Sequence, residues 1–254
     1  MIYGLWLSTA GLQVNEYRQS VIANNIANAD TVGFKRDLAV IRERDVESKV
    51  NRQGMQYANR LLDGLSGGSF ARPTHTIFEP GSLKQTSRSL DLAIDGEGFF
   101  AIETEEGTRY TRDGRFVRGE DGTLRTAAGG HGVLDVSGMP IRLDPNASVS
   151  SIRVGQDGRI FVGRQEAGQV AIQDFGDKTK LRKLGGNLVV NLGSDEKKAT
   201  GRVKSGALEQ SNVAPVEDMV DMIEATRAYQ MNASLIQMQD AMLERAVNDV
   251  GRIG

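Results

Sequence analysis

The sequence predicts an α+β protein in which long N- and C-terminal helices pair in the manner of a coiled coil around a turn-rich, all-β middle. Two observations predict this class. Of the 30 glycines, 20 lie between Asp95 and Gly206, and none lies between 12 and 32 or between 207 and 250. The five prolines all lie from Pro73 to Pro215. Because Gly and Pro mark turns and are costly inside helices, the ends are expected to be helical and the middle to form short strands.

The composition excludes several classes of function. The 254 residues carry 31 Lys and Arg against 33 Asp and Glu, so a formal net charge of -2 gives no electrostatic case for a nucleic-acid partner. The absence of cysteine excludes disulfides, thiolate metal sites and cysteine nucleophiles. No apolar run approaches the roughly 18 residues of a membrane-spanning helix, so insertion into a lipid bilayer is not expected. The first residues also lack the features of a cleaved secretory signal peptide.

The N-terminal segment from 2 to 28 has helical periodicity. Only Glu16 and Arg18 are charged before Asp30, and a helix exposed to solvent carries more charge than this. We therefore expect neighbours to cover it on several sides. Its apolar residues recur at spacings of three and four, at Leu7, Ala10, Val14, Tyr17 and Val21.

The C-terminal helix is predicted to begin at Pro215, because proline suits the first turn of a helix. Two apolar stripes run along it side by side. They indicate either one wide face toward the core or contacts with more than one neighbour. The sequence does not decide which of the two stripes faces the chain's own partner helix. One stripe includes Met219, Met222, Tyr229, Ile236 and Leu243, and the other includes Met231, Leu235, Met238 and Met242.

The middle is predicted to form short strands joined by tight turns. Asp-Gly pairs between alternating apolar residues are typical hairpin turns, and they occur at 113–114, 121–122 and 157–158. We expect strands at 90–94, 99–103, 109–111, 115–117, 151–154, 159–162, 169–175 and 187–190.

The sequence shows no catalytic, cofactor or metal site. The segment 64–68 lacks the Gly-Lys-Ser/Thr ending of a phosphate-binding loop, and His131 lies in an ordinary glycine turn. The Asp-Gly pairs do not form the acidic loop of a calcium site. Glu103, Glu105 and Glu106 resemble a glycosidase pair only in being adjacent carboxylates, and they precede a turn at Gly107. We therefore expect no enzymatic activity and no cofactor.

One local segment is more specific. Asn24, Asn25 and Asn28 lie near the end of the first helix, followed by Gly33 and Phe34. Asparagine is a good cap and turn residue, and glycine permits a left-handed backbone there. The amides are expected either to cap the helix or to bind the backbone of a neighbouring subunit.

This segment resembles a signature of the bacterial flagellar rod and hook protein family, Asn-Asn-Leu-Ala-Asn-x-x-Thr-x-Gly-Phe/Tyr-Lys, which here runs from Asn24 to Lys35. The likeness continues in family order at 90–100, 110–116, 208–213 and 217–230. The resemblance implies a structural protein of the flagellar axis, built from paired terminal helices and a central β domain. It also implies export through the flagellar type III apparatus without a cleaved signal peptide, and a place in the basal-body rod that crosses the periplasm.

The resemblance leaves two members of the family open. Hook proteins are longer, and the smallest rod proteins lack a β domain. The C-terminal motifs at 208–213, 229–230 and 243–248 are similar to the proximal rod protein with a β domain, which is the favoured interpretation. The stretch 43–68 resembles in length an extra segment of the distal rod protein. Competing classes are a secreted β-rich binding module and a hydrolase that uses the acids near Glu103.

The expected organisation has three parts. Residues 1–45 and 207–254 form a helical assembly domain, 46–69 an extended polar connector, and 70–206 a β-rich domain. The expected partners are other copies of the chain, other axial proteins of the flagellum and the export apparatus. The expected assembly interface comprises Leu7, Val14, Tyr17, Val21, Asn24, Asn25, Asn28, Gly33, Phe34, Met219, Ile223, Tyr229, Leu235, Ile236, Met242 and Leu243.

Overall fold

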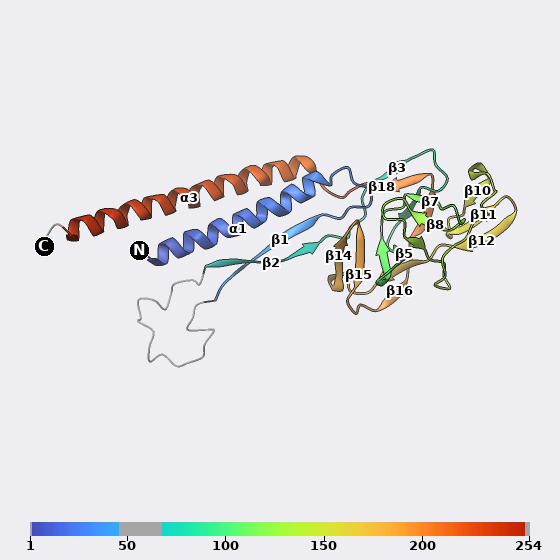
Figure 1. Cartoon of the computed structure of the whole chain (residues 1–254), viewed down its shortest axis with the longest axis horizontal. Helices are drawn as coiled ribbons and strands as arrows, with labels where there is room; N and C mark the ends of the chain where they lie inside the picture. The colour runs from blue at the N-terminus through green and yellow to red at the C-terminus, as the bar shows by residue number, and fades with distance from the viewer. Residues whose placement is uncertain (1, 46–67, 252–254) are drawn as a thin grey trace. The chain divides into compact units, whose positions relative to one another are not determined.

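Both expected terminal helices are present in the computed structural model, which describes residues 2–45 and 68–251 (Figure 1). Helix α1 spans Ile2–Ala27 and helix α3 spans Pro215–Gly251. Pro215 begins α3 as predicted, and Glu217 and Asp218 in its first turn complement the positive end of the helix dipole. The region between the helices is rich in short strands, so the α+β class is confirmed.

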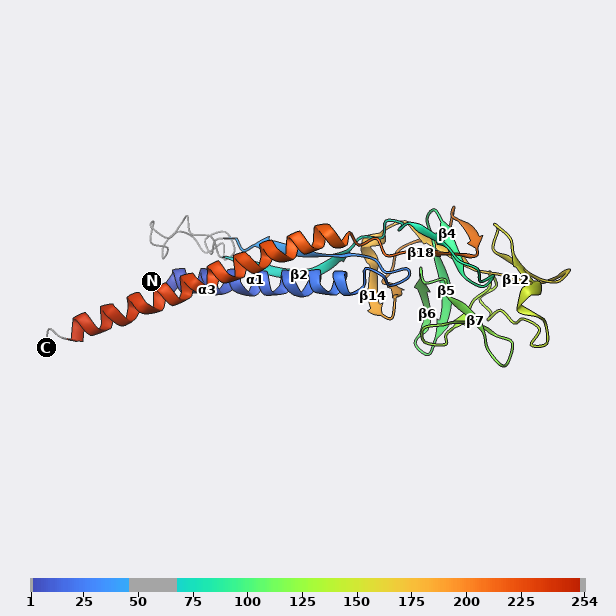
Figure 2. The same cartoon turned by 90° about the horizontal axis from the view of Figure 1, so that it is seen from above.

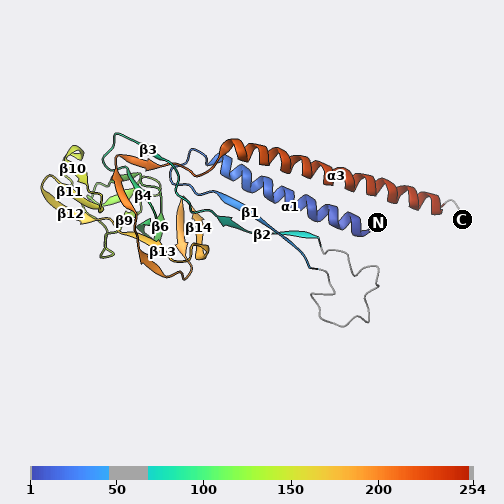
Figure 3. The ribbon, with the colours of Figure 1, turned by 180° about the vertical axis from the view of Figure 1, so that it is seen from behind.

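The chain divides into two units. The first contains 1–26, 37–75 and 214–254, and the second contains 27–36 and 76–213. In the first unit a two-stranded ribbon of β1 (Asp37–Glu43) and β2 (Ser69–Thr76) accompanies the helices (Figure 3). The hydroxyl of Tyr17 donates to the carbonyl of Arg72 at 2.9 Å, which ties α1 to this ribbon. The sequence did not predict β1, and the polar connector expected at 46–69 lies almost entirely outside the described residues.

The second unit is built on a sheet of nine strands. Its main path runs in the order β14-β15-β6-β5-β9-β8-β7, and β13 joins β5 and β16 beside it. Figure 2 shows β5 and β6, its most extended antiparallel pair, from above. The nine strands are β5 Phe99–Thr104, β6 Gly107–Thr111, β7 Phe116–Arg118, β8 Leu124–Thr126, β9 Gly132–Val133, β13 Ile172–Phe175, β14 Leu181–Gly185, β15 Leu188–Asn191 and β16 Glu196–Lys198.

Smaller sheets complete this unit. The strands β10 to β12 form one sheet, and the antiparallel pairs β17 with β4 and β18 with β3 form two others. The ranges are β3 Leu83–Gln85, β4 Leu92–Asp95, β10 Ile152–Val154, β11 Arg159–Val162, β12 Gln165–Gln169, β17 Arg202–Ser205 and β18 Ala207–Glu209.

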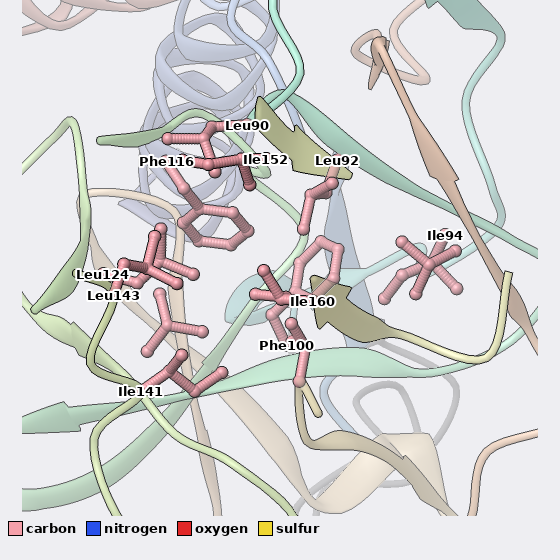
Figure 4. Close-up of a cluster of buried hydrophobic side chains, with 13 residues drawn as sticks. Leu90, Leu92, Ile94, Phe100, Phe116, Leu124, Ile141, Leu143, Ile152 and Ile160 are labelled. Carbon is pink, nitrogen blue, oxygen red and sulfur yellow. The ribbon is translucent and has the colours of Figure 1, made fainter. Parts of the chain in front are cut away.

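Strand β5 separates two hydrophobic cores. Side chains alternate between the faces of a strand, so Phe100 enters one core while Phe99 and Ala101 enter the other. Figure 4 shows the first core, in which Phe100 and Phe116 meet edge to face with ring centroids 5.1 Å apart. In the second core Phe99 packs between Phe78, which it meets edge to face, and Phe175, whose ring is tilted against it.

Two of the three predicted hairpins form. Asp121-Gly122 connects β7 to β8, and Asp157-Gly158 connects β10 to β11. The prediction at Asp113-Gly114 is wrong, because β6 pairs with β5 and β15 while β7 pairs with β8. There the Asp113 carboxylate folds back to accept from the backbone and side chain of Arg115.

The strand predicted over 169–175 is also wrong as a single element. It breaks between β12 and β13, which pair with different neighbours.

Candidate assembly surfaces

One face of α3 is covered within the first unit. Its members recur at alternating steps of four and three, and their side chains are buried or half-buried. We call this face the inner stripe, and it comprises Met222, Ala225, Tyr229, Asn232, Ile236, Gln239, Leu243 and Ala246.

Two glycines of α1 receive polar side chains of the inner stripe. A Cβ built on Gly4 would lie 2.9 Å from Nε2 of Gln239, and one on Gly11 would lie 2.8 Å from Oδ1 of Asn232. Both pairs step by seven residues in opposite directions, so the two helices run antiparallel, side by side in Figures 1 and 3. Glycine at these positions lets the backbone of α1 approach α3. Sequence reasoning missed this contact, although the heptad spacing of the two glycines was a visible signal.

Apolar side chains are also exposed on α3, beside the inner stripe. We call a set of them the outer stripe, and its exposed fractions run from 44% at Leu235 to 63% at Met231. Sequence alone did not decide which stripe is covered within the chain. The structure covers Ile236 and Leu243 and exposes their neighbours Leu235 and Met242. The outer stripe comprises Met231, Leu235, Met238 and Met242, together with Ile223 and with Met219, which the spacing placed on the other stripe but which is exposed.

The predicted residues of α1 lie mainly on its covered side. Val14 and Val21 are buried, and Leu7 and Tyr17 are half-buried. Trp6, which the sequence did not single out, is exposed.

Asn25 closes a turn within its own chain. Its Nδ2 donates to the carbonyl of Asp37 at 2.8 Å, and its Oδ1 accepts from the backbone N–H of Asp37 at 3.0 Å. The side chain is buried, so both ends of the amide link α1 to the start of β1. Asn28 accepts from the hydroxyl of Thr31 at 3.2 Å in a local turn, and Asn24 is exposed.

Gly33 and Phe34 anchor the segment 27–36 in the second unit. Gly33 has a left-handed φ of 69°, and its N–H donates to the carbonyl of Glu209 at 2.8 Å. Phe34 is buried, and the Nζ of Lys183 lies 3.9 Å from its ring centroid. A cation above an aromatic face is attracted by the electrons of the ring, which helps to hold Phe34.

Three buried charged side chains meet beside this anchor. Oε1 of Glu209 accepts from Nζ of Lys35 and from the backbone N–H of Gly81, and its Oε2 accepts from Nη1 of Arg112 at 2.9 Å. We call Lys35, Arg112 and Glu209 the charge triad, and each member is no more than 4% exposed. Burial lowers the pKa of Lys35, an effect that the carboxylate of Glu209 opposes. Sequence reasoning missed the triad as a unit, because its members are brought together only by the fold.

The part of the chain that the structure describes places the acidic residues near Glu103 at a hairpin turn. No group of three or more His, Asp or Glu side chains in that described part is placed to hold a metal ion. Glu105 and Glu106 form the two-residue turn between β5 and β6, where Glu106 pairs with Arg109 at 3.2 Å. None of the described helices is long and apolar enough to cross a membrane.

Known proteins match this chain along nearly its whole length. The flagellar basal-body rod protein FlgG of Bacillus subtilis is 35% identical over an alignment of 267 residues. The alignment covers 98% of this chain and 99% of the relative. The chain belongs to the flagellar basal-body rod protein family. FlgF of Caulobacter vibrioides is also 35% identical, over 92% of this chain and 91% of its own, and FlgG of Borreliella burgdorferi is 33% identical over 98% of both.

Three family models match separate parts of the rod protein. The model of the flagella basal body rod protein matches residues 8–35, in α1 and the asparagine segment. The D1 domain of the flagellar hook protein FlgE/F/G matches 93–162, and the C-terminal model of the basal body rod FlgEFG protein matches 204–249. The resemblance first drawn from short motifs is therefore confirmed.

Proposed function

We propose that this chain is a structural protomer of the bacterial flagellar rod, which assembles helically through its terminal helices. The outer stripe of α3 carries the proposal. Six large apolar side chains of this helix are exposed in the single chain, and exposed apolar patches mark protein interfaces. If this stripe docks on a different surface of a second copy, the contact is head-to-tail, and a head-to-tail contact whose rotation does not close a ring generates a helical filament.

The inner stripe supports separate roles for the two stripes of α3. It pairs with α1 inside one protomer in the manner of a coiled coil, which leaves the outer stripe for neighbouring protomers. In this proposal the terminal segments 1–45 and 207–254 are the assembly domain. Its partners are other copies of the chain, other axial proteins and the flagellar export apparatus, and it is located where the rod crosses the periplasm.

Within the rod we propose the proximal position. The support is the likeness of the C-terminal motifs at 208–213 and 243–248 to the proximal type. The length of the stretch 43–68 favours the distal rod protein as the second candidate. Cryo-electron microscopy of basal bodies in which this chain is tagged distinguishes the two, because density near the membrane ring supports the proximal type and density beneath the hook supports the distal type.

Met242→Asp tests the outer stripe. Met242 is exposed in the single chain, so the variant is expected to fold and be exported, with a thermal midpoint within a few degrees of the wild type. In a packed interface the new carboxylate is buried without a partner, which costs several kcal/mol for each protomer. We therefore expect secretion without rod growth, measured by a secretion assay and by electron micrographs of basal bodies.

Gln237→Asp is the matched control, because it adds the same charge at an exposed position that is already polar. It is expected to leave rod growth intact. Rods of normal length with both Met242→Asp and Leu235→Asp contradict assembly through this stripe. A chain that stays monomeric in light scattering at rising concentration favours the competing β-rich binding module.

A further inference from the structure

The charge triad joins parts of the chain that are far apart in sequence. Lys35 and Glu209 are separated by 174 positions, and Arg112 and Glu209 by 97. Each belongs to one of the short motifs that first identified the family. The motifs therefore converge on one buried cluster in the second unit.

Backbone contacts around the triad tie three segments together. The N–H of Gly33 donates to the carbonyl of Glu209, and the N–H of Ile77 donates to the carbonyl of Arg36 at 2.9 Å. The N–H of Gln210 donates to the carbonyl of Ser82 at 2.8 Å. The segments 33–36, 77–82 and 209–212 are thus fixed to one another.

Side chains reinforce these contacts. Asn212 accepts from the backbone N–H of Arg36 at 2.7 Å and donates to the carbonyl of Ile77 at 2.9 Å. Lys35 donates a further hydrogen bond to the carbonyl of Glu79 at 2.7 Å. Arg112 donates to the carbonyl of Gly96 at 2.8 Å, which connects the cluster to the end of β4.

These segments lie beside the places where the chain passes between its two units. The passages fall at 26–27, 36–37, 75–76 and 213–214. Along the chain, three of the four entries into the β unit are therefore next to segments that the triad fixes.

Stability alone does not explain a buried charged cluster. Replacing such a cluster by apolar residues of similar volume is often neutral or stabilising, because burial removes the water around each charge. A charged cluster instead favours one arrangement of the chain segments over other arrangements. Both oxygens of Glu209 have donors in this arrangement, and a shifted arrangement would leave buried charges without partners.

We infer that the charge triad is a register lock, which holds the segments 33–36, 77–82 and 209–212 in one alignment, so that this part of the β unit carries torque as one rigid element. The lock is a property of the single chain, whereas its use in carrying torque rests on the proposed function.

Hydrogen exchange of the purified full chain tests the lock. Glu209→Gln keeps the shape of the side chain and removes the charge that Lys35 and Arg112 share. We expect the amides of Gly33, Ile77 and Gln210 to exchange at least tenfold faster, while the amides of β5 change less than twofold. Lys204→Met is the control. It removes the ion pair between Lys204 and Asp95, which are 2.7 Å apart and whose side chains are both more than half exposed. It is expected to change none of these amides.

A second variant covers the case in which Glu209→Gln does not fold. The combination Lys35→Met, Arg112→Met and Glu209→Leu removes every charge of the triad, so no charged group is left buried without a partner. It is expected to retain the protection of β5 and to lose at least tenfold at Gly33 and Gln210. Exchange within twofold of the wild type at those amides, in either folded variant, overturns the lock.

Motility of cells that carry the triple variant tests the torque role separately. We expect the variant to be exported and the cells to lose swimming in viscous medium. Normal swimming together with faster exchange supports the lock and overturns its mechanical role. Flagella that are intact after deletion of the whole chain overturn the proposed function, and the exchange result for the lock still stands.

Discussion

Gly33→Ala is expected to destabilise the β unit far more than the same change at another glycine with the same backbone conformation. Gly33 and Gly130 have φ values of 69° and 68°. A Cβ on Gly33 would lie 2.5 Å from the carbonyl carbon of Arg112 and 2.6 Å from the backbone N of Asp113. A Cβ on Gly130 would meet nothing within 4 Å. The pair therefore separates steric overlap from conformational strain.

The magnitudes follow from these two contributions. A residue other than glycine in the left-handed region costs roughly 1–2 kcal/mol, and this cost applies to both variants. Overpacking against atoms that have no room to move adds roughly 1–3 kcal/mol at Gly33 alone, because its neighbours are backbone. We expect the free energy of unfolding to fall by about 2–5 kcal/mol for Gly33→Ala and by about 1–2 kcal/mol for Gly130→Ala.

Urea unfolding of the full chain, followed by far-ultraviolet circular dichroism, measures both variants under the same conditions. Equal losses at the two positions would refute the reasoning, since they would mean that the backbone of Arg112 and Asp113 moves aside without cost.

Three further predictions concern other positions. Asn25→Leu removes both hydrogen bonds to Asp37 and is expected to lower the free energy of unfolding by about 1–3 kcal/mol, with a smaller effect for Leu at the exposed Asn24, measured by thermal melting. Burial, together with the hydrogen bond to Glu196, raises the pKa of Tyr110. Its contribution to stability is therefore present below the unfolded pKa of about 10 and is lost as the pH rises above it, and Tyr110→Phe is expected to flatten this decline in alkaline urea titrations. Ile236→Asp charges the inner stripe and is expected to make α1 and α3 more sensitive to limited proteolysis while the β unit stays resistant.

The helices were predictable because their signals are local. A long interval without Gly, apolar spacing of three and four, and Pro215 at the start all act within one segment. Two hairpins were predictable for the same reason, since the turn residues determine them. The third Asp-Gly pair did not form a hairpin. At Gly114 a Cβ would lie 1.6 Å from the carbonyl oxygen of Leu92, so this glycine serves a close approach of two chain segments.

The candidate surfaces were predictable only in part. Spacing showed two stripes on α3, but the covered stripe depends on where α1 packs, and only the fold decides that. Asn25 was singled out correctly as a residue with a special role, and its partner Asp37 lies 12 positions away. The charge triad could not be found from sequence, because its ion pairs span 97 and 174 positions.

The glycine contacts between α1 and α3 have a consequence for how the helix pair finds its alignment. Sliding one helix by seven residues, about 10.5 Å, would place Gly4 opposite Asn232 and Gly11 opposite Ala225, which is also small. After this shift an amide side chain again lies over a glycine at one of the two sites. The glycine contacts alone therefore do not fix the alignment of the two helices. The short segments where the chain enters and leaves the helices therefore contribute to this alignment, and changes in them are expected to shift one helix along the other.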